Sequence, residues 1–586
     1  MKLTILGGGG FRVPLVYKAL IADEAPGRVT ELRLYDTDET RLGAIRAVLD
    51  ELAAEAQDPP TLISTTDLGE ALAGTDFIFS AIRVGGAPGR ALDEKISLSH
   101  GVIGQETVGA GGISYALRGI PAVLKIVEAV KEHAPDAYFI NFTNPAGVIT
   151  EVLRKHLGDR VVGICDSPVG MARRVLDVLK GAGLVAADVP NVSAGSGRVK
   201  LKYAGLNHLG WLTGLHVDGE DVLPKLFERP DLIESFEEGR LFGADLIQAL
   251  KAVPNEYLHY YYFPREAFAV DSVSDKTRGR FLAEQQKGFY EKSDDGLSAH
   301  ERWDRTRLER EQTYMATNRE AAGNFERDEA DLETGGYDKV ALAIMHAIAN
   351  DTPVELILNV ANNGALPDLD DAAVVEIPCR VDASGVAPLA GAKLPDHGRG
   401  LVINAKYVER RTIDAALNQS RDDALLALSH HPLVDSFHVA EELLADLVAA
   451  FPEDLAYLSE DPADDGEAPV ENAESSEQLA VHTEGPYRSN TAWAVALEAA
   501  KGAAAGNPEY RDAVQVIRHL GWRAPQEAVS WHEGTTPSVV ANSPAMGVVP
   551  GMAVQRAMAL VVARLVETAS TPLQREHAAM FAAMVG

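Results

Sequence analysis

The sequence has 586 residues, which exceeds the size at which a single hydrophobic core stops growing, so two or three domains are expected. Its 46% hydrophobic and 24% charged residues are typical of an ordinary globular protein and argue against general disorder. The formal net charge of −32 argues against nucleic-acid binding over the whole surface, which needs clustered Lys and Arg, so an anionic ligand would require a local basic pocket.

Cysteine content and the N-terminus indicate the compartment. Cys165 and Cys379 are the only cysteines, so no disulfide framework is expected, as is typical of a reducing compartment. The chain enters a strand-like run at once, without the apolar segment of a signal peptide, and no apolar stretch approaches the roughly 18 residues that span a bilayer. We expect a cytoplasmic protein that does not bind a membrane.

The chain opens with five short apolar runs, most of them separated by helix-like segments. They cover residues 3–6, 31–35, 77–81, 137–141 and 161–165. This alternation predicts a mainly parallel sheet with helices on both faces. We therefore expect residues 1–165 to form an α/β domain of the Rossmann type, with a doubly wound parallel sheet.

The pattern changes after this first domain. Residues 199–218 alternate between polar and apolar side chains, and helix-rich stretches and a β-like segment at 374–381 follow, which predicts an α+β domain over 166–458. Residues 459–478 are acidic and nearly free of large apolar side chains, so we expect an exposed linker there. Residues 479–586 would form a helical appendage of unknown role.

A glycine-rich loop follows the first strand immediately. It consists of Gly7, Gly8, Gly9, Gly10 and Phe11. Glycines at this place let the backbone approach a pyrophosphate at a helix N-terminus. Asp36 ends the second strand, where a carboxylate would accept hydrogen bonds from the adenosine ribose and favour NAD over NADP. The alternative is a tight strand-to-helix turn followed by an ordinary strand-end Asp.

Five further motifs occur in chain order. They are Arg83-Val-Gly, Gly104-Gln-Glu-Thr107, Asn141-Phe-Thr-Asn-Pro145, Cys165-Asp-Ser-Pro168 and Asn207-His208. In order and spacing they resemble the NAD- and metal-dependent family 4 glycoside hydrolases, over residues 1–458. The resemblance implies a Rossmann-type domain followed by an α+β catalytic domain, with Arg83 beside the cofactor.

The resemblance also implies a metal site. The family holds a divalent ion, usually manganese, with one Cys and one His, which here would be Cys165 and His208. So few protein ligands leave coordination positions open for two substrate hydroxyls. The alternatives are a buried structural thiol and a satisfied core imidazole.

The implied reaction begins with hydride transfer from sugar C3 to NAD, after which the metal polarises the ketone and a base removes the C2 proton. Elimination then expels the aglycone, water adds, and the hydride returns. The family's base is a Tyr in a Pro-x-x-Tyr turn, which 254–257 matches, so Tyr257 is the expected base. Its phenol needs a pKa well below about 10, which the metal and nearby cations could supply. The alternative is an aromatic packing stripe with Tyr260, Tyr261 and Tyr262.

Arginines are expected to bind a phosphate, because the guanidinium fork matches its oxygens two at a time. Arg90 and Arg278 match the family's positions, and Arg280 could take the place of Arg278; the alternative is a solvated helix face. Asn144 matches a substrate-binding Asn of the family or is a turn residue, and Glu106 is expected to support the same site.

The anomer of the substrate is the open question. Family members that act on 6-phospho-α-glucosides usually carry Asp after the metal Cys, as a general acid, and this chain has Asp166. Residues 109–112 and 205–211 resemble instead the members that act on 6-phospho-β-glucosides. We expect a 6-phospho-β-glucosidase, with a 6-phospho-α-glucosidase as the alternative.

Three other functions are weighed against this one. A lactate- or malate-type dehydrogenase shares the Rossmann domain but would not need Cys165, and a non-catalytic NAD sensor would not need the set of Cys165, His208 and Tyr257. A galactosidase or glucuronidase of the same family usually carries His after the metal Cys. By analogy with the family, a homodimer or homotetramer is expected.

Overall fold

The computed structural model describes residues 1–459, apart from 193–196, 274–276, 292–295 and 324–335. The described residues belong to one compact unit, Met1–Asp464, and a second unit spans Asp465–Gly586. The predicted linker beyond residue 459 and the predicted helical appendage at 479–586 lie outside the described residues. Within the described ranges, no helix has both the length and the apolar character needed to cross a membrane.

The N-terminal half contains six parallel strands. They are β1 (Lys2–Leu6), β2 (Glu31–Tyr35), β3 (Thr61–Thr65), β4 (Phe77–Ser80), β5 (Tyr138–Asn141) and β6 (Val161–Gly163). Their order in the sheet is β3-β2-β1-β4-β5-β6, which is the order of a dinucleotide-binding Rossmann domain. The Rossmann-type parallel sheet is therefore confirmed.

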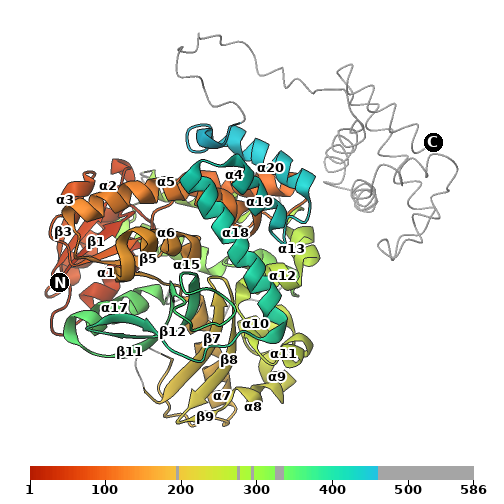
Figure 1. The fold of residues 1–586 in the computed structure, drawn as a ribbon. Coiled ribbons are helices and arrows are strands. Elements are labelled where there is room, and N and C mark those ends of the chain that lie inside the picture. The colour runs from red at the N-terminus through yellow and green to blue at the C-terminus, as the bar shows by residue number, and fades with distance from the viewer. Residues whose placement is uncertain (193–196, 274–276, 292–295, 324–335, 460–586) are drawn as a thin grey trace, which may run out of the picture. The chain divides into compact units, whose positions relative to one another are not determined.

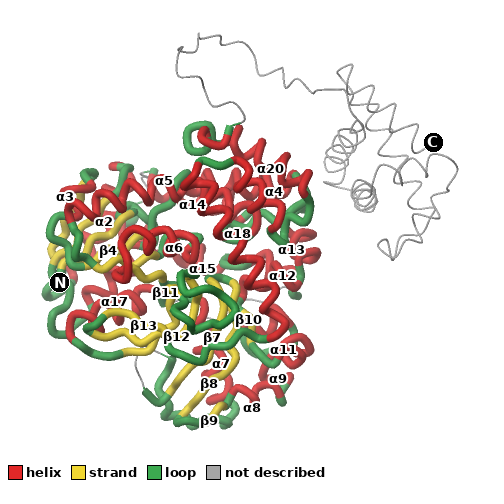
Figure 2. The backbone as a smooth tube through the Cα atoms, in the orientation of Figure 1, coloured by secondary structure: helices red, strands yellow, loops and turns green. Residues whose placement is uncertain are grey.

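The strands that follow are antiparallel. They are β7 (Val199–Leu206), β8 (Leu209–Val217), β9 (Glu220–Asp221), β10 (Val253–Pro254), β11 (Val354–Ala361), β12 (Val374–Asp382) and β13 (Gly385–Pro388). β11 pairs with β6 at Asn359 and Gly163, so both sets form one sheet of 13 strands. In Figure 2 the parallel strands lie near the N-terminus, with β7, β8 and β9 at the other end of the sheet. The predicted domain boundary after residue 165 thus falls inside a continuous sheet.

Helices accompany both parts of the sheet. The first ten are α1 (Val13–Ile21), α2 (Glu39–Glu55), α3 (Leu68–Leu72), α4 (Gly86–Ser99), α5 (Gly109–His133), α6 (Ala146–Leu157), α7 (Ser167–Gly181), α8 (Leu223–Phe227), α9 (Pro230–Ile233) and α10 (Glu237–Phe242). The later ones are α11 (Ala244–Leu250), α12 (His259–Tyr262), α13 (Pro264–Asp271), α14 (Arg278–Tyr290), α15 (Ala299–Gln312), α16 (Ala316–Ala321), α17 (Tyr337–Asn350), α18 (Arg399–Asn418), α19 (Arg421–His430) and α20 (Phe437–Ala450). In Figure 1, α18, α19 and α20 form a layer over α4 and α5, against which they pack.

Burial explains which strands the sequence revealed. β4 is buried at every position, as is usual for a central parallel strand, and it reads as a continuous apolar run. β3 lies at the edge of the sheet, is only half-buried and contains three polar residues, so it carries no such signal. The predicted alternation at 199–218 is the hairpin of β7 and β8, where side chains 199–202 alternate between half-buried and exposed.

The hydrophobic core joins the two halves. One buried cluster contains Leu3 and Leu34 from the parallel strands together with Trp211 and Leu358 from the antiparallel ones. Trp303 of α15 is fully buried in the same cluster, and its Nε1 donates a hydrogen bond to a backbone oxygen of the glycine-rich loop at 2.8 Å. This packing fixes the later helices against the cofactor loop of the first domain.

Candidate active site

A cavity of about 1730 Å³ lies at the carboxyl ends of the central parallel strands. Gly7, Ala81, Asn144 and Cys165, which follow β1, β4, β5 and β6, all line it. Ligands of open α/β sheets bind at this edge, and the volume exceeds that of a usual single-ligand pocket. All predicted site residues line this cavity except Gly8 and Gly9.

The glycine-rich loop fits tightly between β2 and β4. Gly7 has φ +86°, and a Cβ there would lie 2.8 Å from the carbonyl oxygen of Ala81. A Cβ at Gly8 would lie 2.8 Å from the Cβ of Leu34, so both positions require glycine. The loop therefore brings its backbone up to the cavity directly before α1, as a bound pyrophosphate requires.

Phe11, the last residue of the predicted loop, has a second role. Its ring lines the cavity but is only 5% exposed, and it packs edge-on against Phe289 of α14 at 5.3 Å between ring centroids. The side chain thus contributes to the core that joins α14 to the loop.

Asp36 is held by backbone groups at the end of β2. Its Oδ2 accepts a hydrogen bond from Gly9 N at 2.9 Å, and its Oδ1 accepts one from Asp38 N at 3.1 Å. Tyr290 of α14 donates to Gly9 O at 2.6 Å, and Arg41 stacks over the Tyr290 ring at 3.9 Å. No sequence signal indicated Tyr290 or Arg41, because the contact joins helices far apart in the chain.

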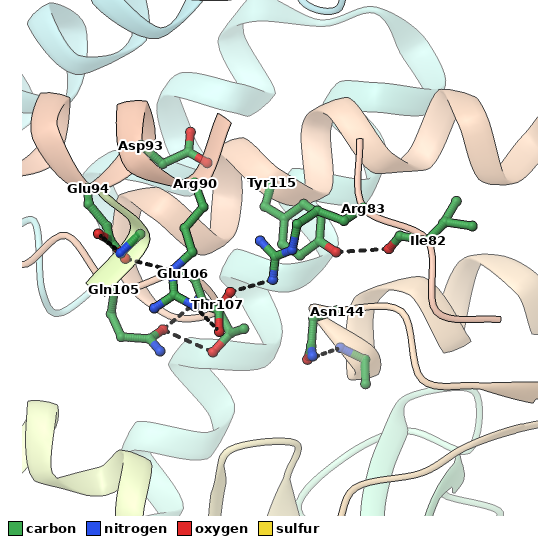
Figure 3. Close-up of polar contacts among 12 residues, drawn as sticks. Ile82, Arg83, Arg90, Asp93, Glu94, Gln105, Glu106, Thr107, Tyr115 and Asn144 are labelled. Carbon is green, nitrogen blue, oxygen red and sulfur yellow. Dashed lines mark hydrogen bonds and ion pairs between the residues drawn. The ribbon is translucent and has the colours of Figure 1, made fainter. Parts of the chain in front are cut away.

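Glu106 lies between α4 and α5 and links two of the predicted arginines, Arg83 and Arg90. It pairs with Arg83, and its Oε1 lies 2.8 Å from Nη1 of Arg90, as the dashed lines in Figure 3 show. Arg90 also donates to Glu94 at 2.7 Å. Burial opposes ionisation of Glu106, but Arg90 and Arg83 outweigh it and lower the pKa of the carboxyl to about 2. Glu106 is therefore an anion that fixes both guanidinium groups.

Arg278 begins α14 and lies in the same cavity. It donates to Thr313 Oγ1 at 2.6 Å and to the carbonyl oxygen of Arg310 at 2.9 Å. Burial, followed by the charges of Arg310 and Arg90, lowers the pKa of Arg278 to about 9. Arg280 is exposed and pairs with Glu284, so the register of the motif places Arg278 in the cavity.

Arg310 of α15 also lines the cavity, and the sequence analysis missed it. Burial and the charge of Arg12 lower its pKa to about 10. The charges of Arg310 and Arg90 both lower the pKa of Arg278, so three guanidinium groups lie near one another here, and such a cluster suits a dianionic phosphate.

His208 is oriented by a chain of hydrogen bonds. Thr107 Oγ1 donates to Gln105 Oε1 at 2.9 Å and lies 2.9 Å from His208 Nδ1. Because the single hydroxyl hydrogen points to Gln105, Thr107 accepts from Nδ1–H, and Nε2 keeps its lone pair. Burial lowers the pKa of His208 to about 4, so the imidazole is neutral at neutral pH. A neutral ring with a free Nε2 fits a metal ligand.

Cys165 follows β6 and is buried at the cavity wall. Burial, Glu376 and Asp166 raise the pKa of its thiol, and a bound divalent cation acts in the opposite direction. Among the described residues, no group of three or more His, Cys, Asp and Glu side chains is placed to hold a metal. A cation held by Cys165 and His208 would thus have open coordination positions.

Tyr257 lies in a short 3-10 helix (Glu256–Leu258) after β10. Its ring stacks on His208 at 3.7 Å with an angle of 7° between the planes, and its hydroxyl lies 3.1 Å from that of Tyr314. Burial, with the charges of Glu256 and Glu106, raises the pKa of the phenol well above 10. The hydrogen bond with Tyr314 lowers this pKa but does not outweigh the burial, so the expected net lowering is left to a bound cation.

The neighbouring tyrosines have other hydrogen-bond partners. Tyr260 lines the cavity and donates to Asn318 Oδ1 at 2.8 Å, and Tyr262 accepts from Trp211 Nε1 at 3.1 Å. Tyr261 packs in the core away from this cavity. These contacts favour the packing interpretation for all three.

Asn144 and Asp166 both line the cavity. Asn144 Oδ1 accepts from Ala146 N at 3.3 Å, so it makes the turn before α6 while it also lines the cavity. Asp166 precedes α7 at the N-cap position without a side-chain capping bond and faces the cavity. Its carboxylate is therefore not used to cap the helix.

Comparison with known proteins identifies the family. Residues 2–181 match the family described as family 4 glycosyl hydrolase, and residues 203–434 match its C-terminal domain. A maltose-6'-phosphate glucosidase of Bacillus subtilis is 31% identical over 464 residues, which cover 77% of this chain and 95% of the relative. The chain belongs to family 4 of the glycosyl hydrolases.

Two further comparisons extend this result within family 4. The 6-phospho-beta-glucosidase BglT of Thermotoga maritima is 32% identical over 454 residues, covering 77% of this chain and 98% of the relative. A solved structure of the 6-phospho-beta-glucosidase from Thermotoga maritima with manganese, NAD+ and glucose-6-phosphate has a TM-score of 0.63 and 28% identity, covering 77% of this chain and 99% of that one. The predicted family and fold are confirmed, and the dehydrogenase alternative is excluded.

Proposed function

We propose that this glycosyl hydrolase cleaves 6-phosphoglucosides, preferably the β-anomers, with NAD and a divalent cation, in the first place Mn²⁺. The observation that carries the proposal is the single cavity, which brings the cofactor loop, a thiol, a neutral imidazole, a buried phenol and an arginine cluster together. Family membership and the relatives named above support the same substrate class and the same cofactors.

Two parts of the chain would hold the cofactors. The glycine loop and Asp36 would bind NAD, because the loop admits a pyrophosphate only without side chains. Cys165 and His208 would bind the cation through the thiolate and Nε2. When bound, NAD supplies a reversible hydride acceptor for sugar C3, and the cation supplies a Lewis acid for the ketone.

The remaining roles belong to side chains of the cavity. Arg278 and Arg310 would bind the 6-phosphate, together with Arg90 as far as its ion pairs with Glu94 and Glu106 leave donors free. Tyr257 would accept the C2 proton, since its phenol ring stacks on His208, which is a proposed ligand of the cation. Arg83, which is paired with Glu106, would border the cofactor.

A second candidate is a 6-phospho-α-glucosidase. Asp166 favours it, because its carboxylate faces the cavity and is not used as a helix cap. The Bacillus subtilis relative, which is named a maltose-6'-phosphate glucosidase, points in the same direction. If Asp166 is a general acid for an α-linked leaving group, Asp166→Asn will reduce cleavage of the α-anomer much more than that of the β-anomer.

Nitrophenol release from the α- and β-nitrophenyl 6-phosphoglucosides tests the proposal. Each substrate is supplied with NAD and Mn²⁺, and again after chelation of the metal or removal of NAD. Cleavage that needs both cofactors is the expected result, and the preferred anomer decides between the two candidates. Cleavage without either cofactor, or no cleavage under any condition, contradicts the proposal.

The phosphate assignment has a matched control in the same motif. Arg278→Ala should raise KM for the 6-phosphorylated substrate by about 10- to 100-fold, because charged hydrogen bonds contribute about 1.5–3 kcal/mol. Arg280→Ala removes an exposed arginine two residues further on and should leave KM unchanged. Equal effects of the two substitutions would contradict the assignment.

A cytoplasmic location and a homodimeric or homotetrameric state stay predictions. Sedimentation of the full chain would measure the oligomeric state.

A further inference from the structure

Tyr257 is one end of a chain of hydrogen bonds in the cavity. Its hydroxyl lies 3.1 Å from the hydroxyl of Tyr314, and Tyr314 donates to Oε1 of Glu256 at 2.8 Å. All three side chains line the cavity, and Tyr257 and Glu256 are buried. The three residues come from two segments of the chain, one directly after β10 and one between α15 and α16.

The number of hydrogens fixes the direction of this chain. A carboxylate only accepts, so the single hydroxyl hydrogen of Tyr314 is used for Glu256. The oxygen of Tyr314 can then only accept from Tyr257. The phenolic hydrogen of Tyr257 therefore points to Tyr314, and a lone pair of the Tyr257 oxygen is left for another partner.

We propose that Tyr314 and Glu256 form a proton relay for Tyr257. As the C2–H bond of the bound sugar breaks, its electron pair stays on the sugar and its proton forms a new O–H bond on Tyr257. Tyr257 passes its own hydrogen to Tyr314, and Tyr314 passes its hydrogen to Oε1 of Glu256. Both tyrosines end neutral, the carboxylate becomes a carboxylic acid, and the reverse sequence returns the proton to C2.

The surroundings of Glu256 suit a temporary proton acceptor. Ser167 donates to the same Oε1 at 3.0 Å, and Arg174 lies 3.9 Å from Oε2. Both contacts favour the carboxylate before the transfer, and Arg174 itself is held in place by its closer ion pair with Glu238. The neighbouring oxygen atoms are close enough for transfer without movement of the backbone.

The relay rests on the proposed function, because it needs a sugar whose C2 proton is removed. It adds two residues that act on the reacting atoms only through Tyr257, and these are positioning residues for the proton. It also removes the need for a free tyrosinate, because the proton ends on a carboxylate.

Tyr314→Phe tests the relay, since it removes one hydroxyl and keeps the ring. The expected result is a fall in kcat of about 100-fold or more with KM within about twofold, because positioned proton transfer contributes factors of that size. The rate should also become more sensitive to deuterium at sugar C2, since proton removal becomes slower than the other steps. Tyr262→Phe is the control, because its hydroxyl is also hydrogen-bonded but does not line this cavity.

Glu256→Gln provides a second variant in case Tyr314→Phe fails to fold. The amide keeps an oxygen for Tyr314 but takes up no proton, so kcat should fall to a similar extent. The double variant should be no slower than the slower single variant, because both residues act in one path. Additive losses, an unchanged C2 isotope effect, or a kcat of Tyr314→Phe within about twofold of wild type would overturn the relay.

The wild-type protein separates this proposal from the proposed function. If wild type cleaves neither nitrophenyl 6-phosphoglucoside, the proposed function fails and the relay fails with it. If wild type cleaves one of them and the variants keep its kcat, the relay alone is wrong. Calorimetric titration with Mn²⁺ should give the same affinity for wild type and Tyr314→Phe, and a loss of affinity would show structural damage in place of a lost relay.

Discussion

The two ends of the cavity are built from different elements of the fold. At the cofactor end, Gly7 lies against the end of β4 and Gly9 donates to Asp36 at the end of β2, while Gly9 O also accepts from Tyr290 of α14. At the sugar end, His208 is oriented by Thr107, 101 positions away, and Tyr257 meets Tyr314, 57 positions away. A substitution at the cofactor end should therefore disturb the loop itself, whereas one at the sugar end should act through partners from other segments.

The strongest test of this difference is removal of the predicted metal thiol. Cys165→Ala should abolish Mn²⁺ binding and lower activity by more than about 100-fold, because even residues behind a metal ligand contribute 10- to 100-fold. NAD binding, measured by calorimetry, should be retained if the two ends are separate. Cys379→Ala is the control, since its buried thiol lies in β12 and donates to Ile377 O at 3.3 Å. Loss of NAD affinity in Cys165→Ala would show that the two ends of the cavity are not separate.

At the cofactor end, Gly7→Ala should destabilise the protein more than the addition of one methyl group suggests. The positive φ costs about 1–2 kcal/mol for a residue with a Cβ, and the contact with Ala81 O adds about 1–3 kcal/mol. Urea denaturation should show this loss of unfolding free energy, and NAD affinity should fall while Mn²⁺ affinity is kept. Gly43→Ala is the matched control, because nothing lies within 4 Å of a Cβ there and its helical position favours Ala.

Acid should destabilise the protein through Glu106. Its folded-state pKa of about 2 lies below the ordinary 4.5, so the carboxylate stabilises the fold above about pH 4.5. This contribution, about 3 kcal/mol by linkage, is lost as the pH falls from 4.5 toward 2. Glu106→Gln should lower the unfolding free energy near neutrality by about 3–5 kcal/mol, because a buried ion pair loses one partner.

The same variant provides the check on that assignment. Unfolding free energies measured by urea denaturation at several pH values should fall less steeply with acid in Glu106→Gln than in wild type. An equal slope for the two proteins would show that other carboxylates dominate.

The smallest expected effect comes from the residue that orients His208. Thr107→Val removes the hydroxyl that accepts from Nδ1–H and should weaken Mn²⁺ binding by about 10- to 100-fold. Thr107→Ser keeps the hydroxyl and should bind Mn²⁺ almost as wild type does. If the variants Thr107→Val and Thr107→Ser bind Mn²⁺ with equal affinity, the tautomer of His208 is set by some other contact.

Much of the cofactor end could be predicted from the sequence. The loop 7–11 and the strand-end Asp36 lie inside one βαβ pattern, so their spacing along the chain fixes their place in space. The motifs of Cys165 and His208 were found only through the family resemblance, because a single Cys and a single His carry no spacing signal of their own. Their roles as metal ligands stay predictions.

The partners at the sugar end could not be predicted. Arg310 and Tyr314 look like ordinary helix and loop residues, and at the cofactor end Tyr290 likewise looks like part of an amphipathic helix. Their importance depends on how α14 and α15 pack against the loop and the 3-10 helix, which no local pattern encodes.

By itself the sequence determined the parallel half of the fold, the glycine loop and the family, because these depend on short-range periodicity and on motifs in a fixed order. Only the tertiary structure decided that β11 joins β6 in one continuous sheet, that Arg278 faces the cavity and Arg280 the solvent, and that Tyr257 is linked to Glu256 through Tyr314. The physical reason is that hydrogen bonds and ion pairs between distant segments depend on packing of the whole core, which forms only when the chain has folded.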